Sequence, residues 1–240
     1  MRVRIVDGAE QVAAVAVGIV GEVLAATPTP VIALPTGRTA MPLYARIAEQ
    51  RAAGGWDLSS ARVFNLDELL LAPAAGGEPH PASFRAFMLE HAGERIGLSS
   101  ARWEMPDPAA DPSSECRRYD RALADAAPLD LAVLGIGVDG HVAYNLPGAP
   151  HSGTHVVAVP DAVADTLAIA ETERPLRAIT IGLGPLRGAR RLLLMATGGS
   201  KARAVQALVQ GREDAQWPAS LLRRHPAFDV VLDHAAADLL

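Results

Sequence analysis

The chain has 240 residues, half of them apolar, which is long enough for a sizeable buried core. A formal net charge of -5 and the lack of a basic stripe argue against nucleic acid as the main partner. No run approaches the roughly 20 continuous apolar residues of a membrane span, and the strand-like first residues lack a signal-peptide layout. One cysteine, Cys116, excludes an intrachain disulfide and a cysteine-based zinc cluster. We therefore expect a single cytoplasmic domain over residues 1–240, with no membrane or nucleic-acid partner.

Short apolar strands alternate with amphipathic helices along the chain. Helices are predicted at residues 9–26, 41–53, 81–95, 114–126 and 201–209. Strands are predicted at 31–34, 61–65, 131–134, 156–159, 178–181, 192–196 and 229–232. This alternation predicts an α/β fold that is doubly wound and Rossmann-like, with a mostly parallel sheet and helices on both faces.

Four polar, glycine-bearing or acidic loops follow directly on predicted strands. They are Pro35 to Thr39, Asp67-Glu68, Gly137 to His141, and Thr197 to Lys201. If these strands are parallel, all four loops lie at one edge of the sheet, which is where ligands bind in such folds. The sequence therefore predicts a small-molecule site at that edge.

The third loop has the most informative residues, because Asp139 and His141 stand two residues apart on a glycine-rich turn. A carboxylate and an imidazole there can exchange protons with a small ligand, since glycine lets the ligand approach the backbone. The alternative is an ordinary strand-to-helix turn in which the aspartate caps a helix and the histidine is polar surface.

The first loop, Thr36-Gly37-Arg38-Thr39, joins a strand to a helix. Its hydroxyls and amides suit an anion at the helix N-terminus, although a simple turn with a threonine cap is equally compatible. The loop lacks the Gly-Lys-Ser/Thr ending of a Walker motif, and no GxGxxG follows a strand. The usual nucleotide-binding motifs are therefore absent.

Lys201 is the single lysine among 22 basic residues, and it follows the glycine-rich run 197–200. A phosphate or other anion site explains this position, while chance placement on a surface helix is the alternative.

Asp67 and Glu68 end a predicted strand, where acidic residues are often solvated caps. Shaded by apolar neighbours, such a carboxylate instead has its pKa raised and acts as a base toward carbon. The seven histidines show no HxH or HExxH spacing, so no metal site is expected.

Together these loops resemble the superfamily of glucosamine-6-phosphate deaminases (isomerases) and 6-phosphogluconolactonases. The resemblance is carried by LPTGRT, FNLDE, HPASFRAFM, LGIGVDGHVAYN and TGGSKARAVQALVQG. FNLDE, HPASFRAFM and GHVAYN favour the deaminase branch. The resemblance implies a phosphosugar substrate, converted to a ketose 6-phosphate and ammonia without metal or organic cofactor.

By position, the resemblance implies that Asp67 moves a proton between C2 and C1 of the opened sugar. Asp139 and His141 would help to open the pyranose ring. Lys201, with the loop Thr36 to Thr39, would bind the phosphate.

Two departures bear on the substrate. Leu146 stands where the deaminases usually have a glutamate that relays protons to the histidine. No lysine or arginine occurs between Arg121 and Arg174, where the deaminases have a phosphate-binding arginine, and Arg38 could supply that charge.

Three functions stay open: an amino-sugar phosphate deaminase or isomerase, a 6-phosphogluconolactonase with His141 as base for water, and a sugar-phosphate-binding protein without catalysis. The sequence also leaves open whether the chain forms a homo-oligomer.

Overall fold

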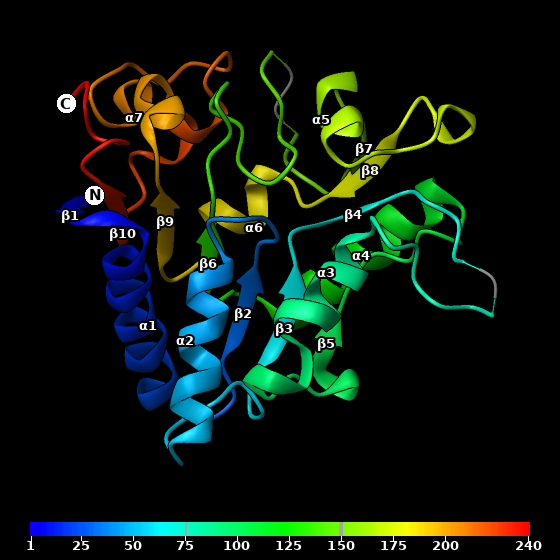
Figure 1. Cartoon of the computed structure of the whole chain (residues 1–240), viewed down its shortest axis with the longest axis horizontal. Coiled ribbons are helices and arrows are strands. Elements are labelled where there is room, and N and C mark those ends of the chain that lie inside the picture. The colour runs from blue at the N-terminus through cyan, green and yellow to red at the C-terminus, as the bar shows by residue number, and fades with distance from the viewer. Residues whose placement is uncertain (75, 149–150) are drawn as a thin grey trace.

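The computed structural model describes residues 1–74, 76–148 and 151–240, and its centre is a seven-stranded sheet (Figure 1). Every neighbouring pair in this sheet is parallel. In spatial order the strands are β1 (Arg2–Val6), β10 (Phe228–Asp233), β9 (Leu192–Ala196), β6 (Leu131–Leu134), β2 (Val31–Leu34), β3 (Arg62–Asn65) and β5 (Trp103–Glu104). The predicted α/β class with a mostly parallel sheet is confirmed.

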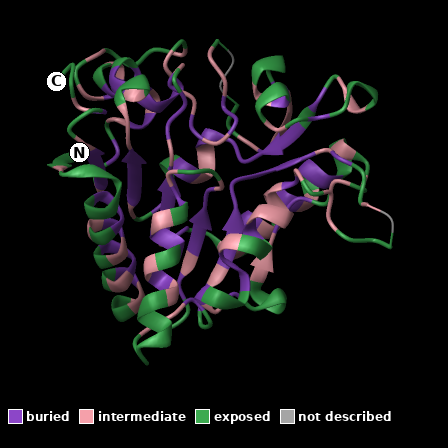
Figure 2. Ribbon diagram, viewed as in Figure 1, coloured by how far each residue is buried: buried purple, intermediate pink, exposed green. Residues whose placement is uncertain are grey.

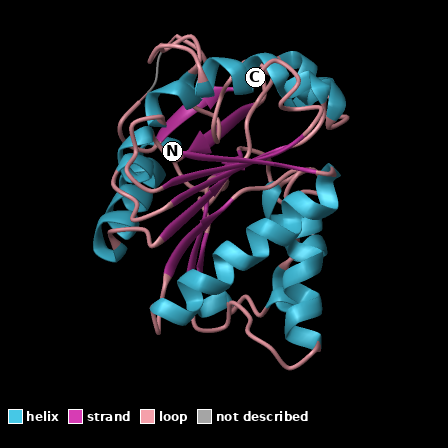
Figure 3. Cartoon of the chain, turned by 90° about the vertical axis from the view of Figure 1, so that its left-hand side faces the viewer, coloured by secondary structure: helices cyan, strands magenta, loops and turns pink. Residues whose placement is uncertain are grey.

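Helices cover both faces of this sheet (Figure 3). Side chains alternate along each strand, so Leu131 and Val133 of β6 enter one apolar cluster, while Ala132 and Leu134 enter the other. The first cluster is covered by α1 (Gly8–Ala26), α2 (Met41–Ala52) and α3 (Phe84–His91). The second is covered by α4 (Pro112–Ala126), α6 (Leu183–Arg187) and α7 (Ala202–Val209).

The sequence predicts no segment that could span a membrane, but helix α1 meets the criteria of length and composition. Its 19 residues are long and apolar enough to cross a membrane by length and composition alone. Continuous apolar runs do not reveal this helix, because Glu10, Gln11 and Glu22 interrupt it. In the fold, one stripe of α1 that includes Val12 and Ile19 packs into the core against the sheet (Figure 2).

A second, antiparallel sheet of three strands lies beside the carboxyl end of β3. It contains β4 (Asp67–Leu69), β8 (Arg177–Thr180) and β7 (His155–Ala158), and α5 (Asp161–Thr166) packs against it. The strands predicted at 156–159 and 178–181 are thus real but do not belong to the parallel sheet. Likewise Asp67 and Glu68, predicted as a loop, form most of a strand. An apolar pattern identifies a strand but not its partner, and a three-residue strand with two acidic residues gives no pattern.

Two helix boundaries also differ from prediction. The helix predicted over 81–95 ends at His91, and the 3-10 helix η1 (Gly93–Ile96) follows, because Gly93 adopts a positive φ of 44°. Helix α4 starts at Pro112 and not within the serines, because Asp111 accepts a hydrogen bond of 2.9 Å from the Ser114 N–H. The remaining 3-10 helices are η2 (Ser100–Arg102), η3 (Glu171–Glu173), η4 (Gly199–Lys201) and η5 (Pro218–Leu222).

Strands β9, β6, β2 and β3 are consecutive neighbours in the parallel sheet. Their carboxyl ends therefore share one edge, as the sequence predicted for the four polar loops. The chain winds outward in one direction from β2 through β3 and in the other from β6 through β9, so the strand order reverses between β2 and β6. A crevice for ligands is expected at such a reversal, and the loops with Thr36 and Asp139 flank it.

Candidate active site

Asp67 is the first residue of β4, and its side chain is buried, with 6% of the residue exposed. Its partner across the antiparallel pair is Thr180 of β8. Burial, helped by the charge of Glu68, raises the pKa of Asp67 to about 8. A solvated cap would have neither property. Asp67 is a carboxyl group that can take up and release a proton near neutral pH.

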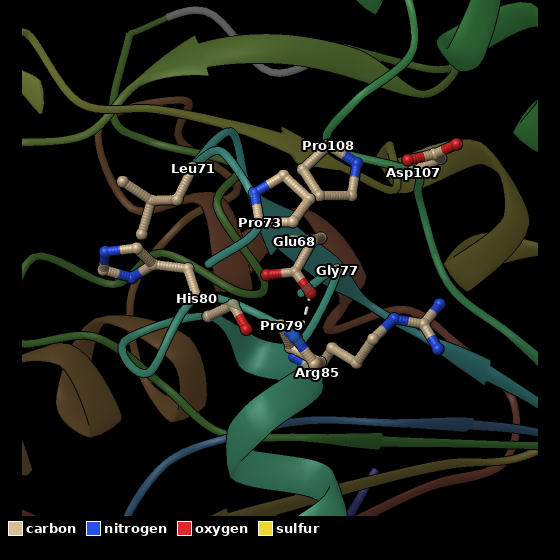
Figure 4. Close-up of a pocket in the computed structure, with 10 residues that line it drawn as sticks. Glu68, Leu71, Pro73, Gly77, Pro79, His80, Arg85, Asp107 and Pro108 are labelled. Atoms are coloured by element: carbon tan, nitrogen blue, oxygen red, sulfur yellow. Dashed lines mark hydrogen bonds between the residues drawn. The ribbon is translucent and has the colours of Figure 1, made fainter. Parts of the chain in front are cut away.

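Glu68 caps helix α3 from the buried side (Figure 4). Its carboxylate accepts hydrogen bonds of 2.8 Å from the N–H groups of both Phe84 and Arg85, and one of 2.7 Å from Leu69 N–H. Burial raises the pKa of Glu68, and these three donors act in the opposite direction. Glu68 is therefore a buried cap of α3, and the alternative of a solvated cap at a strand end is wrong for this residue.

A cavity of about 300 Å³ lies beside Glu68, under the segment that leads into α3 (Figure 4). Its polar lining includes His80, Arg85 and Asp107. Nε2 of His80 lies 3.2 Å from a carboxylate oxygen of Glu173, which links this segment to η3. The described residues that line the cavity include none of the predicted catalytic or phosphate-binding residues.

The turn after β6 brings Asp139 and His141 together. Oδ1 of Asp139 lies 2.7 Å from Nδ1 of His141 and also accepts from the His141 N–H at 3.2 Å. Gly137 is needed for this arrangement, because a Cβ there would lie 2.2 Å from Nδ1 of His141. Gly140 has a φ of 81°, and Trp217 packs close against it. The structure thus brings the two predicted residues into contact, on a turn that glycine makes possible.

Two hydrogen bonds fix the conformation of the loop after β2. The Tyr44 hydroxyl donates to the carbonyl of Pro35, and Ala40 N–H donates to the carbonyl of Gly37 at 3.0 Å. Gly37 has a φ of 101°, which a residue with a side chain rarely adopts. Arg38 is exposed at the tip.

Lys201 lies at the end of η4 and is partly buried. Burial lowers its pKa; the charge of Arg38 adds to this effect, and the charge of Asp139 opposes it. The structure therefore brings Lys201 into electrostatic range of Arg38 and of Asp139. No carboxylate of the described residues lies within ion-pair distance of Lys201 or Arg38. Two cations without an acidic partner suit an anionic ligand.

Asp233, at the end of β10, holds the backbone of the loop that carries Lys201. Both of its carboxylate oxygens lie 3.0 Å from the N–H of Gly198. Sequence reasoning missed this residue because its partner is 35 positions away.

Sequence reasoning also missed Tyr144 as a member of the site. Its ring is stacked on the His141 ring at a centroid distance of 5.9 Å, and on the Phe84 ring at 5.9 Å. Its N–H donates to Oγ1 of Thr180 at 3.0 Å. Burial, together with the charge of Asp67, holds the pKa of Tyr144 well above its ordinary value. The only sequence signal was its place in the run GHVAYN.

Comparison with known proteins identifies the family. Residues 6–231 match the glucosamine-6-phosphate isomerases/6-phosphogluconolactonase family. The chain belongs to this family. It is 35% identical over 245 residues to a glucosamine-6-phosphate deaminase of Hahella chejuensis, covering 100% of this chain and 92% of the relative. It is also 37% identical over 225 residues to a glucosamine-6-phosphate deaminase of Streptomyces avermitilis, covering 91% and 85%.

Solved structures of the family have the same fold. A monomeric glucosamine-6-phosphate deaminase superposes with a TM-score of 0.92 at 28% identity, covering 100% of both chains. A 6-phosphogluconolactonase from Thermotoga maritima superposes with a TM-score of 0.74 at 19% identity, covering 96% of this chain and 98% of its own. The second comparison concerns the fold alone. Both activities named for the family involve a phosphosugar substrate.

Proposed function

We propose that this chain is a glucosamine-6-phosphate deaminase, which converts glucosamine 6-phosphate and water to fructose 6-phosphate and ammonia. The observation that carries the proposal is the buried Asp67, whose pKa is raised to about 8, at the same sheet edge as the Asp139–His141 pair. A base for carbon and a separate pair for oxygen are the two acid/base functions that this reaction requires. The curated relatives at 35–37% identity have this activity in their names.

In the proposed reaction, His141 first assists the opening of the sugar ring. Its Nδ1 faces Asp139, so Nε2 is free to pass a proton between the C1 hydroxyl and the ring oxygen. Asp139 stabilises the imidazolium that forms when the ring accepts a proton. The product of this step is the open aldehyde.

Asp67 then acts on the open chain. As a carboxylate it takes the proton from C2 and returns it to C1. In the same conversion the C1 oxygen gains a proton and the amine nitrogen loses one, so that the aldehyde and amine become an alcohol and an imine. Addition of water to the imine carbon and loss of ammonia leave the ketone of the ketose 6-phosphate. A base with a pKa of about 8 suits this step, because it returns the proton as readily as it takes it.

Lys201 and the loop from Thr36 to Thr39 hold the phosphate in this proposal. Lys201 and Arg38 supply the positive charge, and the backbone of the loop supplies N–H donors at the start of α2. Arg38 stands in for the arginine that is missing between Arg121 and Arg174.

We expect neither a metal nor an organic cofactor. The cytoplasm is the expected compartment for a chain with a single cysteine.

The test is product formation by the purified chain. With glucosamine 6-phosphate we expect ammonia and fructose 6-phosphate in equal amounts, unaffected by a chelator. Asp67→Asn should abolish both products, and Asp125→Asn, an exposed change on α4, serves as the matched control. Hydrolysis of 6-phosphogluconolactone that survives Asp67→Asn, without ammonia release by the wild type, would select the lactonase function instead. Saturable binding of the phosphosugar without any turnover would select a binding protein.

A further inference from the structure

Tyr144 is stacked with His141 and is linked to Asp67 through Thr180. Its N–H donates to Oγ1 of Thr180 at 3.0 Å, and Thr180 is the direct cross-strand partner of Asp67. Thr180 is fully buried, so this anchor is shielded from water. The next residue, Asn145, donates from Nδ2 to the carbonyl of Ile181 at 2.9 Å. The Tyr144 backbone is therefore fixed relative to Asp67.

The Tyr144 ring is stacked with two other rings. Its plane lies at 16° to the His141 ring and at 6° to the Phe84 ring, each at a centroid distance of 5.9 Å. Phe84 is itself fixed, because it is the first residue of α3 and its N–H donates to Glu68 at 2.8 Å. The stack connects the His141 imidazole to a helix end that Glu68 holds in place.

The other neighbours of the His141 imidazole lie at one edge of the ring. Asp139 contacts Nδ1, and Gly137 lies close to Nδ1 and Cε1. Position 146, the other position near the pair in the sequence, holds a leucine that packs with the apolar cluster of the small sheet. Among the described residues, Tyr144 is the aromatic residue whose ring is stacked with that of His141.

We propose that Tyr144 is a positioning residue, which fixes the plane of the His141 ring through the stack on Phe84 and so directs Nε2 toward the substrate. The consequence for catalysis rests on the proposed deaminase function, whereas the stack itself does not. The ring, and not the hydroxyl, performs this role, so a phenylalanine preserves it. Phe84 acts one step further away by stacking with Tyr144.

Three variants separate these contributions. Tyr144→Phe keeps the ring, Tyr144→Leu removes it, and Phe84→Leu removes only its support. The first readout is the NMR shift of the His141 Cε1–Hε1 group without any substrate, assigned with a His141→Gln variant. We expect the shift to stay in place in Tyr144→Phe, to move toward that of an unstacked histidine in Tyr144→Leu, and to move less in Phe84→Leu.

The second readout is kinetic. We expect Tyr144→Phe to stay within about threefold of wild-type kcat, and Tyr144→Leu to lose about 10²-fold in kcat with KM little changed, as for a misplaced catalytic group. Loss of activity in Tyr144→Phe equal to that in Tyr144→Leu would assign the role to the hydroxyl and overturn the proposal. An unchanged His141 shift in a folded Tyr144→Leu variant would also overturn it.

If the wild type has no deaminase activity, the NMR result alone decides whether the stack fixes the His141 ring. If Tyr144→Leu does not fold, Phe84→Leu decides by the same shift, and no movement there would refute the stack.

Discussion

Nδ1 of His141 lies 2.7 Å from Oδ1 of Asp139, so the contact determines which ring nitrogen is free for a substrate. Partial burial acts to raise the pKa of Asp139, but the contact and charge of His141 outweigh it, and that pKa lies below its ordinary value. Asp139 is therefore ionised at neutral pH. It can stabilise a protonated His141 without taking up a proton itself.

Replacing Asp139 by asparagine should lower kcat on glucosamine 6-phosphate by about 10²–10⁴-fold, the usual value of acid/base assistance. The amide has nearly the same shape but lacks the charge that stabilises the imidazolium. Steady-state kinetics of ammonia release measure the effect, with Asp125→Asn as the control for a loss of charge elsewhere. A wild-type kcat in Asp139→Asn would mean that His141 needs no carboxylate partner.

Asp67→Asn should stop the exchange of the C2 hydrogen of the substrate with solvent deuterium, while the phosphosugar still binds. Proton transfer at carbon needs a base, and binding does not. NMR of the substrate in deuterated buffer measures the exchange, and calorimetry measures the binding. Exchange at the wild-type rate would show that Asp67 is not the base.

The same variant has a second expected effect, on stability. The pKa of Asp67 is raised from 3.8 to about 8, so the native chain keeps a proton that the unfolded chain releases within this range. The free energy of unfolding contributed by Asp67 therefore falls as pH rises through this range. Asp67→Asn should thus melt at a higher temperature than the wild type at about pH 9, and the difference should shrink toward about pH 4.

Glu68→Gln tests the link between the helix cap and the base. Removing the Glu68 charge removes the second cause of the raised pKa of Asp67, so the limb of the kcat–pH profile set by Asp67 should move below about 8. The variant should also unfold more easily, by about 1–3 kcal/mol, because the buried N–H groups lose a charged acceptor. Asp107→Asn, at the same cavity, is the control. A pH profile identical to the wild type would show that Glu68 does not act on Asp67.

Lys201→Ala should weaken phosphosugar binding by about 1.5–3 kcal/mol, the range for a hydrogen bond to a charged group. Lys201→Arg keeps the charge and should retain most of the affinity. Calorimetry with glucosamine 6-phosphate, compared with glucosamine, shows whether the loss concerns the phosphate. Equal affinity of the alanine variant and the wild type for the phosphosugar would remove Lys201 from the site.

The sequence predicted those parts of the site that depend on local pattern and on the rules of parallel sheets. Buried strands that end in polar loops pointed to Asp139 and Lys201 as candidates, and the common direction of the strands places their loops at one edge. The sequence did not predict contacts between distant segments. The role of Glu68 depends on α3, and the anchor of Tyr144 depends on Thr180, which is 36 positions away. The antiparallel sheet was missed for the same reason, because pairing is decided by tertiary packing.

Leu146 gives the last prediction. If the missing glutamate were only a lost relay, Leu146→Glu would raise kcat on glucosamine 6-phosphate, provided that the new carboxylate faced the site. The structure argues against that condition, because Leu146 packs against an apolar cluster that includes Leu69, Leu71 and Leu176.

We therefore expect no gain in kcat from Leu146→Glu and a loss of unfolding free energy of about 1–3 kcal/mol, the cost of placing a polar group among apolar side chains. Leu146→Met keeps the apolar contact and is the matched control. Thermal melts and ammonia release from the two variants measure both effects. A rise in kcat for Leu146→Glu would mean that the segment turns toward the site and that a relay is what the wild type lacks. If kcat does not rise while the wild type releases ammonia, the wild type opens the ring without a carboxylate at position 146.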